Sequence, residues 1–389
     1  MKVLMISRKF GPLGTMSFGP FSMVYKLVKG LNEKIDISIL SSHLGLPTKE
    51  NVEGISVYRT FFPPIDDLTK WFFMPHVIFE NGIVKKIFPD ILHSQDIEGG
   101  IIFKKYRSTK MKKVFAIKSS ISFRSKSKER NPEYGLKHRI YFRTIDFWER
   151  IAINNADFFI TPTIFLRNEM IEHYRLDESR FFRIMNGTFT DLFRPETDVS
   201  KIKKKLGIKN ERVLFSTSAG WRKGLDALLK AFNIIKKSNP NTKLIIAGRS
   251  KLDVFEKFVD PKVVDKTKDI ILVGNVSNYD FPMYYNLADL FLLPSYMETQ
   301  PNTLIESLSC GTPVVTFKSG GCPELVSKKE GVLVEVGDVE DFAHTTINLL
   351  DNKTKLRKLG IECRERALRD YRIEKIVDEH IKMYEQIIE

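Results

Sequence analysis

Short apolar runs alternate with amphipathic stretches along most of the chain. Runs such as 244–247 and 290–293 show no alternation of polar and apolar positions, which is typical of strands buried on both faces of a parallel sheet. The stretches between the runs repeat apolar residues at helical spacing, so the pattern predicts an α/β protein. The predicted strands are 3–7, 35–40, 55–58, 91–93, 114–117, 158–161, 181–185, 213–216, 244–247, 270–273, 290–293, 313–316 and 332–334.

This array of strands and helices starts twice, which predicts two doubly wound, Rossmann-like domains with parallel sheets. A chain of 389 residues also exceeds the usual size of one core. A strand ends at Asn186-Gly187 and the next helix, 201–206, begins only after Pro195, so the predicted boundary lies near residue 195. The expected parts are domains 1–195 and 196–370 and an amphipathic C-terminal helix, 371–389.

The composition is that of a folded protein, with 42% hydrophobic and 28% charged residues. The three cysteines are unclustered, so the sequence suggests neither a disulfide framework nor a zinc site, and we expect a reducing compartment. The first residues turn polar at Ser7, and no run approaches 18 apolar residues. We therefore expect a cytoplasmic protein without a secretory leader or membrane span.

The positive charge is concentrated in one segment. The net charge is +14, and residues 101–150 hold fifteen Lys and Arg against four Asp and Glu, interleaved with nine aromatic residues. This composition suits contact with an anionic membrane surface, on the inner face of the cell membrane, and a plain solvated face is the alternative. We expect nucleic acid to be an unlikely partner, despite its electrostatic attraction to such a segment.

The segment 293–315, LPSYMETQPNTLIESLSCGTPVV, has the features of a ligand site. A strand ends at Leu293, a loop carries Glu298, and Asn302 occupies a predicted N-cap before a helix over 303–310 that Gly311 ends. Open α/β sheets bind ligands at the carboxyl ends of their strands, and the first N–H groups of a helix favour an anion. A diphosphate is the simplest anion for the N–H groups of residues 303–305.

Two glutamates in this segment are candidate sugar-binding residues. Glu306 lies one turn inside the predicted helix, where its carboxylate would repel a phosphate but could accept hydrogen bonds from a sugar diol. Glu298 could do the same for a second sugar. By spacing alone, two solvated glutamates near a helix start remain the simpler interpretation.

The same motifs resemble a known family. The spacing E-x7-E, followed by SLSCGTPVV and by GGCPELV at 320–326, resembles the signature of the retaining, nucleotide-sugar-dependent glycosyltransferases of family four, which have the GT-B fold. Other segments agree in order, so the resemblance extends from about residue 3 to about residue 385. They are PDILH at 89–93, NG at 186–187 with FRP at 193–195, and WRKG at 221–224.

The resemblance implies a role for each matching residue. Glu306 would bind the nucleotide ribose and Glu298 the hydroxyls of the transferred sugar, while Lys223 and Arg222 would hold the diphosphate and stabilise its developing charge. Because no D-x-D motif is flanked by strands, and because a nucleotide sugar is a substrate, we expect no metal and no cofactor. The other donor-side candidates are Gly11, Gly14, Gly220, Asn302, Thr303 and Leu304.

The acceptor side departs from the family pattern. Family members often carry a histidine after the fifth strand of the first domain, where this chain has Lys118 and Ser119. His93 matches another family position, although a histidine at a strand end is more often a structural residue. These three residues are the candidates for the acceptor or sugar side of the site.

The expected activity is transfer of a hexosyl group, with retention of configuration, from a UDP-sugar in preference to a GDP-sugar. The acceptor would be a glycan or a lipid-linked molecule, and the two domains would face each other across a cleft, with the C-terminal helix returning to the first domain. Two alternatives stay open: a nucleotide-sugar 2-epimerase of the same fold, and a basic, non-catalytic binding protein derived from it.

Overall fold

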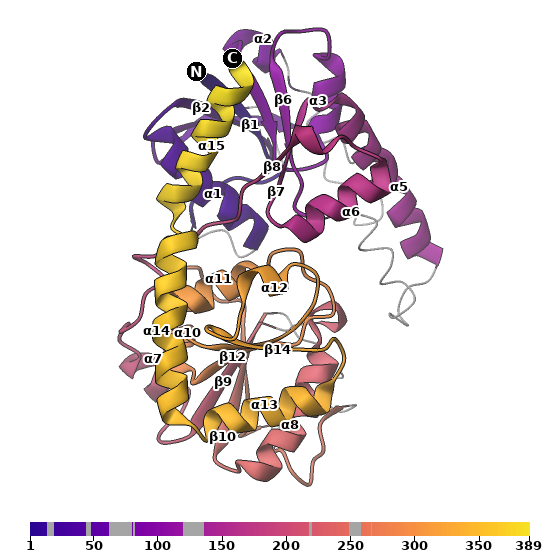
Figure 1. The fold of residues 1–389 in the computed structure, drawn as a ribbon. Helices are drawn as coiled ribbons and strands as arrows, with labels where there is room; N and C mark the ends of the chain where they lie inside the picture. The colour runs from indigo at the N-terminus through magenta and orange to yellow at the C-terminus, as the bar shows by residue number, and fades with distance from the viewer. Residues whose placement is uncertain are drawn as a thin grey trace. The chain divides into compact units, whose positions relative to one another are not determined.

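The computed structural model of the chain consists of two compact units (Figure 1). Unit 1 comprises Met1–Asn186 and Ile373–Glu389, and unit 2 comprises Gly187–Arg372. The structure describes residues 1–13, 19–43, 48–61, 80, 82–119, 136–217, 220–248, 258–265 and 267–389.

Unit 1 is built on a sheet that has eight strands in its described residues. Their order is β3-β4-β2-β1-β5-β6-β7-β8, and all neighbours are parallel except the pair β3 and β4. The central strand β1 is apolar and buried, as expected of a strand covered on both faces. The strands are β1 Lys2–Ile6, β2 Asp36–His43, β3 Thr48–Val52, β4 Ile55–Phe61, β5 Ile91–Ser94, β6 Lys112–Ala116, β7 Phe158–Thr161 and β8 Phe181–Arg183.

The C-terminal helix α15 (Ile373–Ile388) packs on α1 (Gly19–Asn32) within unit 1, although the two are far apart in sequence (Figure 1). Its apolar stripe is buried there. Gly30 allows the close approach, because a Cβ atom at that position would lie 2.6 Å from Val377 Cγ2. The other helices in the described residues of unit 1 are α2 Ile83–Ile87, α3 Gly99–Lys105, α5 Leu136–Asn155 and α6 Ile164–Tyr174, with a 3-10 turn at Glu178–Arg180.

Unit 2 contains, in its described residues, a six-stranded parallel sheet of order β11-β10-β9-β12-β13-β14. The strands are β9 Arg212–Ser216, β10 Thr242–Ala247, β11 Ile270–Gly274, β12 Leu290–Leu293, β13 Val314–Phe317 and β14 Gly331–Val334. The helices are α7 Ser200–Lys205, α8 Leu225–Ser238, α10 Phe281–Leu287, α11 Asn302–Ser309, α12 Cys322–Leu325, α13 Val339–Leu350 and α14 Lys353–Asp370. Because β9 and β12 are central neighbours, the loops that follow them meet at the carboxyl edge of the sheet.

The thirteen predicted strands all correspond to strands of the two sheets, within a few residues at their ends. Strand β3 was missed, because its sequence TKENV is polar and its side chains are mostly exposed at the sheet edge. The described residues include no helix that has both the length and the apolar content needed to cross a membrane.

The two compact units divide between residues 186 and 187, nine residues before the expected domain boundary near residue 195. The segment after Asn186 is tied to unit 2: the Thr188 N–H donates to the Tyr371 carbonyl at 2.8 Å. Arg364 also donates to the carbonyls of Thr190 and Phe193, at 3.0 and 2.9 Å. These contacts involve residues about 170 to 180 positions away in the sequence. A turn motif such as the one at Pro195 carries no information about such distant partners.

Candidate active site

Glu298 is held at the carboxyl edge of the unit 2 sheet by backbone contacts with the loop after β13. Its N–H donates to Ser319 Oγ at 3.1 Å, and its carbonyl accepts from the Gly321 N–H at 3.1 Å. The residue is only 6% exposed. The two loops that carry the E-x7-E and GGCPELV motifs are therefore joined at this glutamate.

The basic turn Trp221–Lys223, a 3-10 turn after β9, lies against the same loop. Gly224 ends the turn with φ +70°, and a Cβ atom there would lie 1.7 Å from the Pro294 carbonyl oxygen, so only glycine fits. The Trp221 ring stacks on Tyr296 at 5.1 Å between centroids. This packing brings the side chains of the turn to Glu298, 75 residues away in sequence.

Lys223 and Arg222 both face the carboxylate of Glu298. Lys223 Nζ donates to Glu298 Oε1, and Arg222 Nη1 lies 3.8 Å from the same oxygen and donates to the Met297 carbonyl at 3.0 Å. Burial raises the pKa of Glu298, but the charges of Lys223 and Arg222 outweigh burial and hold this pKa below its usual value. The carboxylate is therefore ionised at neutral pH, and the two cations are positioned by it.

Glu306 lies in α11 and is 5% exposed. Its Oε2 atom accepts a hydrogen bond from the Tyr285 hydroxyl at 3.2 Å. Burial, followed by the charge of Glu306, raises the pKa of Tyr285 well above its usual value, so the hydroxyl keeps its proton. Sequence reasoning missed Tyr285, because it lies in α10, outside the motif.

The start of α11 differs by one residue from the prediction. The helix begins at Asn302, and Pro301 occupies the N-cap without a side-chain cap, so Asn302 is not the cap. The Leu304 N–H donates to the Pro301 carbonyl at 3.0 Å and is therefore not an open donor. Thr303 Oγ1 is a buried oxygen without a hydrogen-bond partner among the described residues, which is typical of a place that receives a polar ligand.

Gly220 precedes the basic turn and has an extended backbone conformation. The space that a Cβ atom would occupy at this position is open. Gly11 follows β1 and is buried. Gly14 and residues 120–135 of the basic segment lie outside the described residues.

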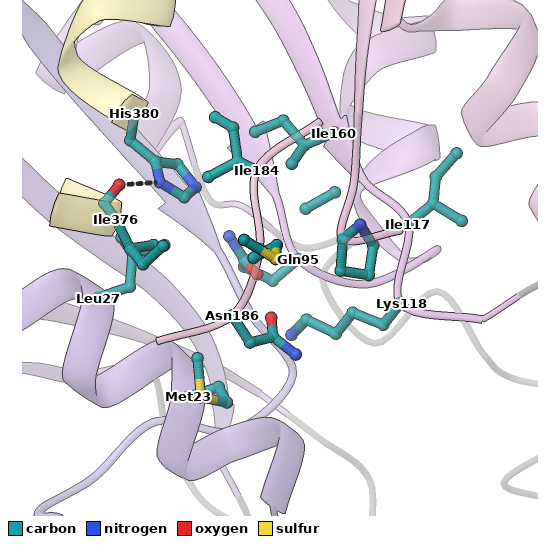
Figure 2. Close-up of a pocket in the computed structure, with 13 residues that line it drawn as sticks. Met23, Leu27, Gln95, Ile117, Lys118, Ile160, Ile184, Asn186, Ile376 and His380 are labelled. Atoms are coloured by element: carbon teal, nitrogen blue, oxygen red, sulfur yellow. Dashed lines mark hydrogen bonds between the residues drawn. The ribbon is translucent and has the colours of Figure 1, made fainter. Parts of the chain in front are cut away.

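In unit 1, Figure 2 shows a pocket at the carboxyl ends of strands β5 to β8. Apolar side chains of the strand ends, α1 and α15 make up most of its lining. Gln95, Lys118 and Asn186 are polar residues of this lining, and the ammonium group of Lys118 is buried. Burial lowers the pKa of Lys118, although Asp96 and Glu98 act in the opposite direction.

Asp96 and Glu98 form, with Arg8 and Lys118, a cluster of charges that sequence reasoning missed. Burial and the charge of Asp96 raise the pKa of Glu98 to about 7, although the Arg8 guanidinium lies 3.5 Å from Glu98 Oε1. These residues follow strands β1, β5 and β6, which are parallel neighbours in the sheet. They therefore lie close together at the carboxyl edge of the sheet. Their position just after a predicted strand was the signal that could have identified them. Ser119, next to Lys118, is partly exposed.

His93 is a buried structural residue and does not line this pocket. Its Nδ1 atom is 2.5 Å from the Tyr384 hydroxyl, and its Nε2 atom is 3.0 Å from Gln95 Nε2. Burial, with smaller contributions from His380 and Lys118, lowers the pKa of His93 well below its usual value, so the ring is neutral. These contacts agree with the structural interpretation, and a role of His93 on the acceptor or sugar side stays a prediction.

Family sequence models cover both units. The model described as Glycosyltransferase Family 4 matches residues 19–192, and that described as Glycosyl transferases group 1 matches residues 198–366. The chain belongs to glycosyltransferase family four. Its fold is GT-B: sucrose-phosphate synthase from Thermosynechococcus elongatus superposes with a TM-score of 0.81 at 18% identity, covering 100% of this chain and 99% of that one.

Curated members of the family match at lower coverage. The GDP-mannose-dependent monoacylated alpha-(1-6)-phosphatidylinositol monomannoside mannosyltransferase of Corynebacterium glutamicum is 27% identical over 46% of this chain and 49% of its own. The UDP-Gal:alpha-D-GlcNAc-diphosphoundecaprenol alpha-1,3-galactosyltransferase of Escherichia coli is 27% identical over 58% of this chain and 60% of its own. The matches thus span about half the length of these relatives.

Proposed function

We propose that the chain is a retaining glycosyltransferase that moves a hexosyl group from a nucleoside-diphosphate sugar to a hydroxyl group of a glycan or lipid-linked acceptor. The observation that carries the proposal is the meeting of Lys223, Arg222 and Glu298 at the carboxyl edge of the unit 2 sheet. Two cations and the start of α11 favour an anion there, and the buried carboxylate can accept hydrogen bonds from sugar hydroxyls.

In this proposal, Lys223 and Arg222 hold the diphosphate. They offset the negative charge that grows on it as the bond between the anomeric carbon and the phosphate oxygen breaks. An ammonium group has three donors, so Lys223 can keep its bond to Glu298 and also donate to a phosphate oxygen. Glu298 binds the transferred sugar and Glu306 the ribose.

The acceptor is activated without an enzymatic nucleophile in the mechanism that the family resemblance implies. The acceptor oxygen bonds to the anomeric carbon on the face from which the diphosphate leaves, and its proton passes to a phosphate oxygen of the leaving group. No metal or cofactor enters this step. We place the acceptor at the pocket of unit 1 that Lys118 lines, because Lys118 occupies the position of the family histidine and the pocket lies at the carboxyl ends of parallel strands.

We propose UDP as the donor nucleotide. The Glu…Pro-Asn form of the motif resembles UDP-sugar members, and the E. coli relative is named for UDP-Gal, whereas the C. glutamicum relative is GDP-mannose-dependent. A thermal-shift panel of UDP, GDP, ADP and CMP tests both the base and the site. A ligand at 100 times its Kd adds about 2.7 kcal/mol of stability.

UDP should stabilise the wild type, and the Glu306→Ala variant should lose this shift. If none of the four nucleotides stabilises the wild type, the donor site is refuted. Product analysis with UDP-sugars then tests the reaction: transfer needs an acceptor, whereas release of a 2-epimer without one would indicate an epimerase instead.

We further propose that unit 1 contacts an anionic membrane surface through one face of α5. Ile140 and Phe147 are 45% and 57% exposed, and Arg143 and Arg150 lie on the same face at spacings of three and four residues. The helix follows the basic sequence of residues 124–130. Exposed apolar residues combined with arginines suit the headgroup region of an anionic bilayer.

Sedimentation with phosphatidylglycerol vesicles tests this contact. Phe147→Glu should reduce binding several-fold, whereas Ile361→Glu, at a position 55% exposed in unit 2, should leave it unchanged. Equal binding by both variants would refute the α5 contact. Binding to a nucleic-acid fragment but not to vesicles would replace the membrane by a nucleic acid.

A further inference from the structure

Tyr285, in α10, donates a hydrogen bond to the carboxylate of Glu306 from outside the α11 motif. Its hydroxyl reaches Glu306 Oε2 at 3.2 Å, and both residues are buried. A carboxylate on a helix can rotate about several side-chain bonds, and a hydrogen bond from a fixed donor selects one orientation.

The ring of Tyr285 is enclosed by aromatic neighbours. The centroids of Phe215, Phe291 and Phe281 lie 5.2, 5.3 and 6.0 Å from its own. Its backbone is also held, since the Tyr285 carbonyl accepts from Thr312 Oγ1 at 2.8 Å, just after the end of α11. Both ends of the residue are therefore anchored to the sheet and to the element that carries Glu306.

We propose that Tyr285 is a positioning residue for Glu306, whose hydroxyl holds the carboxylate in the orientation that receives the ribose hydroxyls of the donor. The inference rests on the proposed function, because it assigns the ribose to Glu306. Tyr285 does not touch the substrate in this arrangement. By fixing the carboxylate before the nucleotide binds, the hydrogen bond lowers the conformational entropy that the Glu306 side chain loses on binding.

The test is a double-mutant cycle on the full chain, with UDP affinity measured by titration calorimetry. Tyr285→Phe removes only the hydroxyl and should weaken UDP binding about tenfold, since a hydrogen bond to a charged group is lost. In the Glu306→Ala background the same substitution should change the affinity less than twofold. The KM for the donor should rise with the Kd while kcat stays within twofold, because the ribose contact is uniform during the reaction.

Tyr284→Phe is the matched control. Tyr284 is also buried, and its ring stacks on Phe215 with 5.6 Å between centroids. The pKa of Tyr284 is raised by burial and by the charge of Asp280, and not by Glu306. The Tyr284→Phe substitution should leave the affinity for UDP unchanged.

Three results would overturn the inference. In the first, Tyr285→Phe weakens UDP binding no more than Tyr284→Phe does. In the second, Tyr285→Phe weakens UDP binding equally with and without Glu306. Either result would leave the proposed function intact. If Glu306→Ala itself binds UDP like the wild type, the ribose assignment fails, and with it both the proposed function and this inference.

Discussion

Replacing Lys223 by methionine should destabilise unit 2 in a manner that depends on pH. The change keeps most of the length of the side chain and removes its charge, so Glu298 loses the hydrogen bond and the positive charge of Lys223. The carboxylate side chain is 7% exposed, and that of Lys223 is 26% exposed. Breaking a fully buried pair costs roughly 3–5 kcal/mol.

The expected loss is smaller than for a fully buried pair. Lys223 is partly solvated, and Arg222 still faces the carboxylate at 3.8 Å, so we expect about 2 kcal/mol at neutral pH. For a unit of this size that corresponds to a decrease of about 4–8 °C in Tm. Scanning calorimetry should show the decrease in the transition of unit 2 and leave the transition of unit 1 unchanged.

The sign of the pH dependence follows from the pKa of Glu298. In the wild type this pKa lies below 4.5, so the pair stabilises the fold above pH 4.5, and this contribution is lost as the pH falls through the folded pKa. Without Lys223, burial dominates and the pKa rises above 4.5. The deficit of the variant should thus be largest at pH 7–8 and shrink toward pH 5, where protonation removes the buried charge.

Lys318→Met provides the control, because Lys318 pairs with Glu335 and their side chains are 44% and 70% exposed. It should lower Tm by about 1 °C or less. If Lys223→Met behaves like this control, or if its deficit is the same at pH 5 and pH 8, the interpretation of the Lys223–Glu298 pair is wrong.

Other substitutions test the packing that supports the two units. Gly224→Ala should prevent unit 2 from folding normally, because its Cβ would overlap the Pro294 carbonyl and φ is +70°, whereas Gly220→Ala should leave Tm unchanged; equal soluble yield and Tm for both would contradict this. Gly30→Ala should lower the Tm of unit 1 because its Cβ would clash with Val377, and adding Val377→Ala should restore part of the loss. If the effects of the two substitutions on Tm simply add in the double variant, this explanation is wrong. Burial lowers the pKa of His380 from 6.5 to about 4, so unit 1 should lose about 3 kcal/mol between pH 6.5 and pH 4; His380→Phe should flatten this dependence in urea titrations, and an unchanged slope would argue against it.

The sequence alone contained the strands, both parallel sheets and the residues of the donor motif. Each apolar run is a local pattern, and burial on both faces of a strand requires it whatever the rest of the chain does. Glu298 and Glu306 were identified by their spacing around a predicted helix start, and Lys223 by the resemblance of the WRKG segment to the family motif. The polar edge strand Thr48–Val52 lacks this pattern, because its side chains are mostly exposed to solvent and not buried on both faces.

Only the tertiary structure decided which of these residues meet. Lys223 and Glu298 are 75 positions apart and form an ion pair because β9 and β12 are neighbours in the sheet. Tyr285 donates to Glu306 because α10 packs on α11, and the 187–195 segment joins unit 2 because Arg364 binds its carbonyls. Sequence periodicity records whether a residue is buried, whereas its partner depends on strand order and helix packing, which are set by contacts along the whole chain.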